Sequence, residues 1–410
     1  MRPETGARPR IPDLGRRGLL GLAASAGSVI LLPGCTLPER GAAVPKFGTT
    51  RATVLGIQNE RFFPITDSVG LEKEFLASSE RARLFHGLAV DAPLPRVQML
   101  AISGGAENGA FGAGLLCGWS DSGTRPRFDL VTGVSTGAFT AAFVFLGSKY
   151  DAQLRSVYTK LTTADIMVRR SPSAALFDDA LADSMPLANI IAEYMNSAMM
   201  ADIAAGYDEG RLLLVATTHL DARQPVIWNL GAIARSGHPQ ALRIMQRILL
   251  ASAAVPGALP PAMMDVTLDG RPYQEMHVDG GAVAQVFLYP AGVNRRRREK
   301  IARHQTVTPA IAYVIRNGRL DPEWVAVERQ ALGIAMAAIL TMITASGNND
   351  IARMYQSTQR DGIDFNLAYI GRDFTMEAPE PLDPAFMRAL FDYGYQRARN
   401  GYEWAKQPPI

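Results

Sequence analysis

The chain has 410 residues, of which 48% are hydrophobic and 20% are charged, and this composition excludes a disordered or fibrous protein. Its formal net charge is +3, but the first 34 residues contain five of the 42 Lys and Arg residues and two of the 39 Asp and Glu residues, which leaves 37 of each sign in the rest. The basic excess therefore belongs to the N-terminal segment and does not indicate a nucleic-acid surface.

Residues 1–34 have the layout of an export signal. A basic opening precedes an uncharged stretch from Gly18 to Leu32, which is too short to cross a bilayer as a helix. The sequence LPGC, which ends at Cys35, resembles a bacterial lipobox, and this resemblance implies a lipidated cysteine on an exported protein anchored in the cell envelope. Thr36 is not the Asp that marks inner-membrane retention, which favours the outer membrane. Pro33 departs from the lipobox pattern, so a plain secretory peptide stays open.

Residues 35–60 contain several prolines and glycines and are expected to form a tether, and residues 61–410 a single domain. The predicted strands are 97–102, 127–135, 211–220, 224–230, 275–281, 309–317 and 364–371. The predicted helices are 108–119, 136–147, 180–200, 240–252, 324–346 and 383–406. This alternation predicts an α/β fold whose sheet is covered on both faces. The small residues of 108–119 are expected to bring that helix close to the sheet, and the apolar residues of 331–345 are expected in the core, with an acyl pocket as the alternative.

The sequence LVTGVSTGAF, residues 130–139, contains a GxSxG pattern around Ser135. A serine hydroxyl is a weak nucleophile unless a base lies within hydrogen-bond distance and donors stabilise the oxyanion that forms on attack. Gly133 and Gly137 permit a sharp turn between a strand and a helix, which exposes the hydroxyl and places the helix N-terminus behind it. Taken alone, the five residues are equally compatible with a turn of small packing residues.

A glycine-rich loop, SGGAENG at residues 103–109, follows the predicted strand 97–102 and precedes a helix. Its backbone N–H groups are expected to converge at a helix N-terminus, as an anion or oxyanion site requires. A nucleotide-binding loop is the alternative. No GKT or GKS sequence follows, which argues against nucleotide binding.

The candidate base is an aspartate rather than a histidine. Of the five histidines, only His304 comes late enough in the chain for the α/β-hydrolase order, and it lies in the charged sequence NRRRREKIARH. The sequence HVDGG, residues 277–281, instead ends a predicted strand at Asp279. A carboxylate of ordinary pKa is a weak base, so this residue must be partly desolvated and close to Ser135. His277 falls on the same strand face and is expected to be structural.

Four motifs resemble, in their order, those of the patatin-like phospholipases: SGGAENG at 103–109, GVSTG at 133–137, ASAAVPGALPP at 251–261 and DGG at 279–281. The resemblance spans residues 97–290. It implies a three-layer fold around a mostly parallel sheet, and hydrolysis of fatty acyl esters of lipids by a serine–aspartate dyad. It assigns Ser135 as the nucleophile and Asp279 as its base. It also assigns the nucleophile turn to Gly133 and Gly137, the DGG motif to Gly280 and Gly281, and the oxyanion hole to Gly104, Gly105, Ala106, Asn108 and Gly109.

Two positions depart from the family's loop, which commonly reads G-G-G-x-Arg/Lys-G. Ala106 replaces the third glycine and Asn108 replaces the basic residue. The methyl group of Ala106 restricts the loop if its φ is positive, and loss of the cation removes a stabiliser of negative charge. A catalytically silent binding module of the same fold therefore stays as the alternative. Ser252, in the third motif, is expected to be a local cap.

No metal or cofactor is expected. Cys35 is assigned to the lipobox, which leaves Cys117 without a disulfide partner, and no cluster of Cys and His indicates a zinc site. The expected partners are a lipid or fatty acyl ester substrate and the membrane that holds the anchor, with no nucleic acid.

Overall fold

The structure, a computed structural model, describes residues 40–409 except 90–91, 93, 171–178, 291, 323 and 328. The predicted export signal 1–34 and the lipidation site Cys35 lie outside the described residues. From Arg40 onward the chain forms one compact unit.

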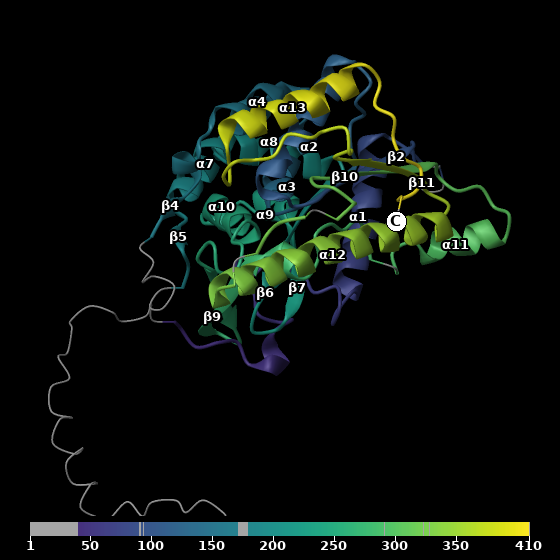
Figure 1. Cartoon of the computed structure of the whole chain (residues 1–410). Helices are drawn as coiled ribbons and strands as arrows, with labels where there is room; N and C mark the ends of the chain where they lie inside the picture. The colour runs from purple at the N-terminus through teal and green to yellow at the C-terminus, as the bar shows by residue number, and fades with distance from the viewer. Residues whose placement is uncertain are drawn as a thin grey trace, which may run out of the picture. The chain divides into compact units, whose positions relative to one another are not determined.

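A mixed sheet of nine strands runs through the described part of the chain (Figure 1). Its order is β1 (Arg61–Phe62), β7 (Gln224–Asn229), β6 (Leu212–His219), β3 (Leu130–Val134), β2 (Val97–Ile102), β10 (Ala310–Arg316) and β11 (Asp364–Tyr369). A hairpin of β8 (Ala262–Leu268) and β9 (Arg271–Asp279) joins it through β6. Neighbours from β6 through β11 pair in parallel, and the antiparallel pairs lie toward β7 and the hairpin.

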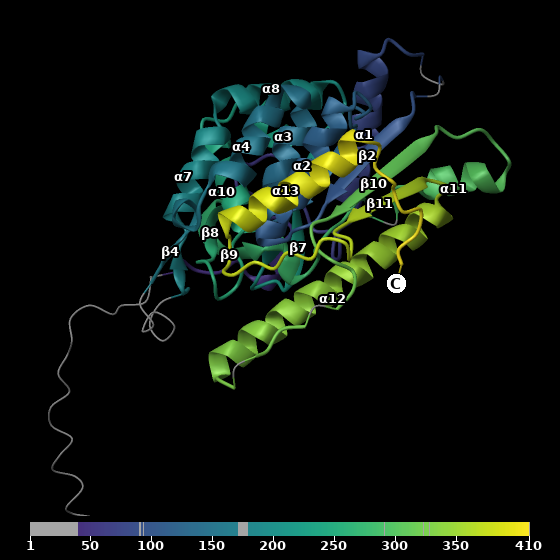
Figure 2. The same cartoon turned by 45° about the horizontal axis from the view of Figure 1, so that its top comes forward.

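Helices cover both faces of the sheet, which gives three layers. Side chains alternate along β2, so that Leu100 and Ile102 enter one core while Met99 and Ala101 enter the other. The first core is completed by α2 (Gly109–Asp121), α3 (Thr136–Leu146), α8 (Ser197–Asp208), α10 (Ala241–Ser252) and α13 (Pro384–Arg399). The second is completed by α1 (Val69–Phe85) and α12 (Ala331–Arg360). Figure 2 shows α12 and α13 on opposite sides of β10 and β11. The predicted three-layer α/β class is confirmed.

Shorter elements connect these layers. They are the helices α4 (Asp151–Lys160), α5 (Thr163–Ile166), α7 (Met185–Tyr194), α9 (Leu230–Arg235) and α11 (Arg295–Ala302), the strand pair β4 (Val168–Arg169) and β5 (Ala182–Asp183), and the one-turn helices η1 (Lys46–Gly48), η2 (Ala106–Asn108), η3 (Ser148–Tyr150) and η4 (Gly280–Ala282). The segment from Arg40 to Glu60 lies along the β8–β9 hairpin. Ala42 accepts a hydrogen bond from the Gln274 N–H at 2.8 Å, and Thr53 pairs with Thr267.

The glycine-rich helix α2 packs against α13 as well as against the sheet. A Cβ on Gly114 would lie 1.9 Å from the carbonyl oxygen of Phe391, and one on Gly118 would lie 2.2 Å from that of Tyr395. These contacts leave no room for a side chain. The prediction that small residues bring α2 close to the sheet is therefore incomplete, because two of them serve a contact with another helix.

Helix α12 differs from its prediction. It starts and ends later than the predicted range 324–346, and its second half packs into the second core. Its first half exposes three large apolar side chains to at least half of their area, Ile334, Leu340 and Met342. The expectation of a buried stripe over 331–345 is therefore wrong for these side chains. No helix in the described ranges is long and apolar enough to span a bilayer.

Candidate active site

Ser135 occupies a sharp turn between β3 and α3. Strand β3 ends at Val134 and helix α3 begins at Thr136, so Ser135 is the single residue between them. Its dihedral angles are φ 56° and ψ −131°, a conformation that residues other than glycine rarely adopt. A Cβ on Gly137 would lie 2.4 Å from the carbonyl oxygen of Ser103, so only glycine fits there. The strand-to-helix turn that GxSxG predicts is present, and its strain is concentrated at the serine.

Ser252, the last residue of α10, holds this strained turn in place. Its hydroxyl accepts a hydrogen bond from the Ser135 N–H at 2.9 Å and donates one to the carbonyl oxygen of Ala216 at 2.8 Å. The Ser252 side chain is buried. The expectation of a local cap misses this role, because nothing in the surrounding sequence indicates which distant strands the hydroxyl joins.

Asp279 ends strand β9 beside Ser135. Its carboxylate accepts a hydrogen bond, 2.7 Å long, from the Gly281 N–H, and the Ser135 side chain also favours its charged form. Burial raises the pKa of Asp279 to about 6, although Ser135 and the Gly281 N–H both act to lower that pKa. Ser135 is 6% exposed and Asp279 is 4% exposed. The site therefore combines a serine with the desolvated carboxylate that a serine–aspartate dyad requires.

The glycines of the GxSxG and DGG motifs lie at the same site. Gly133 is buried in β3, two residues before Ser135. Gly280 and Gly281 are buried at the start of η4, directly after Asp279. The structure thus brings the GxSxG and DGG motifs together from distant parts of the chain.

The glycine-rich loop between β2 and α2 lies against Ser135. A Cβ on Gly104 would lie 2.9 Å from the Cβ of Ser135. The Gly104 N–H donates to the carbonyl oxygen of Gln285 at 3.2 Å, so it is already engaged. In the part of the chain that the structure describes, the N–H groups of Gly105 and Ala106 donate to no protein acceptor. These two groups are therefore available to an oxyanion.

The two residues that depart from the family's loop are the first and last residues of η2. Ala106 has φ 47°, the left-handed conformation in which a methyl group is unfavourable. Asn108 is half-buried at the start of α2, and its side chain makes no capping hydrogen bond. The Gly109 N–H donates back to the carbonyl oxygen of Ala106. A hydrogen bond between backbone groups of the loop therefore stabilises its last turn.

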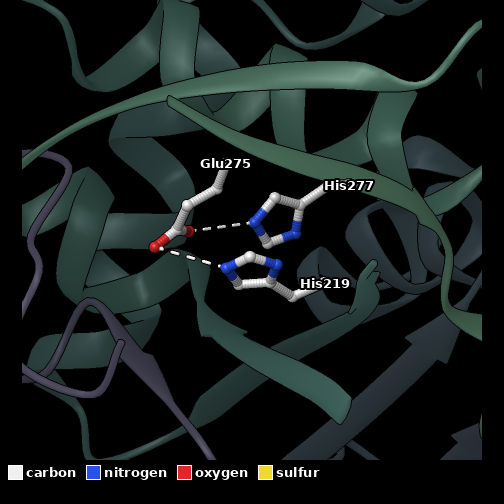
Figure 3. A group of neighbouring side chains, drawn as sticks. All are labelled: His219, Glu275 and His277. Atoms are coloured by element: carbon white, nitrogen blue, oxygen red, sulfur yellow. Dashed lines mark hydrogen bonds and ion pairs between the residues drawn. The ribbon is translucent and has the colours of Figure 1, made fainter. Parts of the chain in front are cut away.

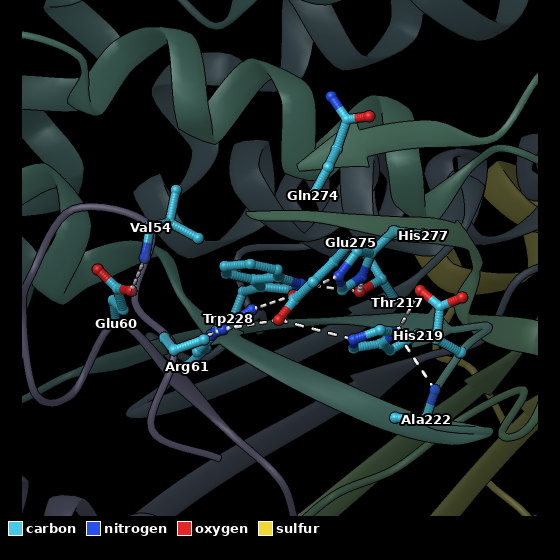
Figure 4. Close-up of polar contacts among 12 residues, drawn as sticks. Val54, Glu60, Arg61, Thr217, His219, Ala222, Trp228, Gln274, Glu275 and His277 are labelled. Carbon is cyan, nitrogen blue, oxygen red and sulfur yellow. Dashed lines mark hydrogen bonds and ion pairs between the residues drawn. The ribbon is translucent and has the colours of Figure 1, made fainter. Parts of the chain in front are cut away.

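A buried chain of polar side chains lies along β9 and its neighbours (Figure 4). Arg61 forms a bidentate ion pair with Glu275, with N–O distances of 2.5 and 3.1 Å. His277 Nε2 lies 3.1 Å from Glu275, and its Nδ1 lies 2.9 Å from the Thr217 hydroxyl, which accepts a hydrogen bond from Trp228 Nε1. Burial lowers the pKa of His277 to about 4. The neutral imidazole therefore donates to Glu275 and accepts from Thr217, which is a structural role.

One cluster in the described ranges has the residue types and spacing of a metal site (Figure 3). It consists of His219, Glu275 and His277, whose candidate ligand atoms all lie within 4.8 Å of one another. Other partners already engage most of these atoms, and of the cluster's ring nitrogens and carboxylate oxygens only His219 Nε2 has no hydrogen-bond partner among the described residues. Arg61 pairs with Glu275, and its positive charge opposes a second cation at the same carboxylate. His219 Nδ1 accepts from the Ala222 N–H at 3.5 Å, which places a proton on Nε2, 3.6 Å from Glu275. The group is a buried ion pair faced by imidazole donors.

Comparison with known proteins connects this site with one family. The model of the family described as patatin-like phospholipase matches residues 100–291. Among solved structures, VipD from Legionella pneumophila is similar at 10% sequence identity, over 76% of this chain and 68% of that chain, with a TM-score of 0.35. No curated protein matches the chain. Residues 100–291 thus match the patatin-like phospholipases, and this segment contains both Ser135 and Asp279.

Proposed function

We propose that this protein is a serine acyl hydrolase that cleaves fatty acyl esters of lipids with Ser135 and Asp279. The observation that carries the proposal is the position of Ser135, at a strained turn, next to the buried carboxylate of Asp279, because β3 and β9 pair with adjacent residues of β6. The match of residues 100–291 to the patatin-like phospholipases supports lipid esters as the substrate class.

In the first half-reaction, Ser135 Oγ attacks the carbonyl carbon of the ester while its proton passes to Asp279. The carbonyl oxygen becomes an oxyanion, for which the N–H groups of Gly105 and Ala106 are donors. The N–H of Thr136 is a third, because the first residue of a helix has no acceptor within it. Cleavage of the ester C–O bond then releases the alcohol, which takes the proton from Asp279, and leaves an acyl-serine.

In the second half-reaction, a water molecule attacks the acyl-serine and Asp279 accepts the proton of that water. Collapse of the second tetrahedral intermediate releases the fatty acid and returns the proton to Ser135 Oγ. A carboxylate with a pKa of about 6 is largely ionised at neutral pH and is a stronger base than an ordinary aspartate. Both steps therefore use the same pair of side chains.

The test is hydrolysis of a panel of p-nitrophenyl esters and phospholipids by the purified protein, together with labelling by a fluorophosphonate. Ser135→Ala and Asp279→Asn should each remove nearly all hydrolysis, and the double variant should be scarcely slower than either, because members of one catalytic unit are not additive. His304→Ala, at an exposed position after α11, is the control and should retain activity. A wild type that neither hydrolyses these esters nor reacts with the probe would favour the silent binding module.

We further propose that the protein is exported and anchored to the bacterial cell envelope by lipid on Cys35. The support is the sequence LPGC after an uncharged stretch. Cys35→Ser should abolish acyl labelling and release the protein from membranes, since each buried CH₂ of the anchor contributes about 0.8 kcal/mol. Cys117→Ser, which changes a buried thiol, is the control and should do neither. Unchanged labelling and retention of the Cys35→Ser variant would contradict the proposal.

A further inference from the structure

We propose that Asn317 is a positioning residue that sets the geometry of the oxyanion loop, residues 103–109, and this proposal rests on the function proposed above. Asn317 directly follows β10, outside the segment 100–291 that matches the family. It is 1% exposed. Nothing in its sequence surroundings distinguishes it from any other residue at the end of a strand, so its role comes from its contacts.

The carboxamide of Asn317 binds the backbone on both sides of the loop. Its Nδ2 donates to the carbonyl oxygen of Ser103 at 2.8 Å, and its Oδ1 accepts from the Gly112 N–H, in the first turn of α2, at 3.1 Å. The main-chain N–H of Asn317 also donates to Ser103 Oγ at 2.8 Å, and that hydroxyl donates to the carbonyl oxygen of Gly104 at 2.7 Å. Asn317 therefore holds both Ser103, where the loop begins, and the first turn of α2, the helix that follows the loop.

The loop has little space in which to move. A Cβ on Gly105 would lie 2.1 Å from the carbonyl oxygen of Asn317, so the backbones of the two segments are in direct contact. Gly104, closer to Ser135, is held by the hydrogen bond from its N–H to the Gln285 carbonyl oxygen. The loop is thus clamped between the end of β10 and the segment that follows η4.

This clamp bears on catalysis because oxyanion donors contribute most when they are already aimed at the place where charge develops. A carboxamide supplies a donor and an acceptor together, whereas an ionised carboxylate only accepts. Asn317→Asp therefore keeps the shape of the side chain but turns an oxygen toward the Ser103 carbonyl oxygen in place of Nδ2–H. The substitution should loosen the loop without touching Ser135 or Asp279.

The experiment compares Asn317→Asp with Asn366→Asp in the purified protein. Asn366 is a matched control, a 5% exposed asparagine on the neighbouring strand β11 that donates to the carbonyl oxygens of Ala312 and Asp364. On a soluble p-nitrophenyl ester, Asn317→Asp should lower kcat by roughly tenfold or more and leave KM within about threefold, because the oxyanion exists only on the reaction path. An alkyl boronic acid, which forms a tetrahedral adduct with a catalytic serine, should bind more weakly by a similar factor. Asn366→Asp should leave both values within about twofold of the wild type.

A second variant covers the case in which Asn317→Asp does not fold, as judged by thermal unfolding. In Gly112→Ala the new methyl group would lie 2.5 Å from Asn317 Oδ1, so it displaces the carboxamide while Asn317 itself is unchanged. It should show the same loss of kcat. The proposal is overturned if the folded variants lose no more kcat than Asn366→Asp, or if the loss is confined to KM. A wild type without ester hydrolysis overturns the proposed function, and the role of Asn317 with it.

Discussion

Asp279 lies next to Ser135 because both residues reach the same edge of strand β6. Val134 pairs in parallel with Ala216, and Asp279 pairs in antiparallel with the next residue, Thr217. Strand β3 therefore leaves this edge where β9 joins it, and the chain turns at Ser135. One edge of β6 thus pairs first with β3 and then with β9, and this places Ser135 next to Asp279.

Hydrolysis is expected to follow one ionisation near pH 6. In the proposed mechanism Asp279 accepts the serine proton only as a carboxylate, and burial raises its pKa to about 6. The kcat/KM for a soluble ester should therefore rise as the pH increases through about 6 and level off by about pH 8, when the base of the free enzyme is ionised. The measurement is a pH–rate profile at constant ionic strength. A midpoint close to 4 would show that the catalytic carboxylate is not desolvated.

Asp279→Asn should stabilise the protein at pH 8 and lose this advantage toward pH 4. The carboxyl has a pKa of about 6 when folded and an ordinary value of 3.8. Above pH 6 both states are ionised, and the folded state carries the cost of the buried charge, about 3 kcal/mol for roughly two pKa units. As the pH falls from 6 toward 4, the folded protein binds the proton first and the cost disappears.

Denaturant unfolding at pH 8, 6 and 4 measures this effect. The control is Asp269→Asn, which changes an aspartate whose side chain is 64% exposed, and its effect should be small at every pH. A gain for Asp279→Asn that stays the same from pH 8 to pH 4 would rule out the buried charge as its cause.

Two substitutions in the glycine-rich loop should change hydrolysis in opposite directions. Ala106→Gly should preserve or raise kcat/KM, because Ala106 has φ 47° and glycine adopts that conformation without strain. Gly105→Val should lower it by at least about 100-fold, since its Cβ would lie 2.1 Å from the Asn317 carbonyl oxygen and displace the donors. Both are measured on one ester, with folding checked by circular dichroism. If Gly105→Val hydrolysed the ester as fast as the wild type, this loop could not be the oxyanion hole.

The buried ion pair between Arg61 and Glu275 should contribute far more to stability than an exposed pair. Arg61→Met leaves Glu275 buried without its cation, which should lower the free energy of unfolding by about 3 to 5 kcal/mol. Arg51→Met removes the exposed partner of Asp269 and should cost no more than about 1 kcal/mol. Urea unfolding at pH 7 compares them. If both variants lost similarly small amounts of free energy of unfolding, Glu275 would not be a buried, unpaired charge in Arg61→Met.

Local patterns were sufficient to predict the elements on either side of Ser135. The apolar run 97–102 corresponds to β2, and the serine of GVSTG lies between β3 and α3. Short apolar runs and glycine positions report backbone preferences within a few residues, so they can be read without knowledge of the fold. The same kind of pattern did not indicate burial in the first half of α12, because an apolar stripe does not show whether another element covers it.

The sequence by itself determined the turn at Ser135, the α/β class and, through a family resemblance, the pairing of Ser135 with Asp279. Only the tertiary structure decided what supports that pair. Ser252 accepts a hydrogen bond from Ser135, 117 positions away, and Asn317 donates one to Ser103, 214 positions away. Each partner is a common residue in an ordinary local setting, and a hydrogen bond between segments so far apart leaves no signal in either one. The contacts exist because β2, β3, β6 and β10 end at the same side of one sheet, and that arrangement arises only when the whole chain folds.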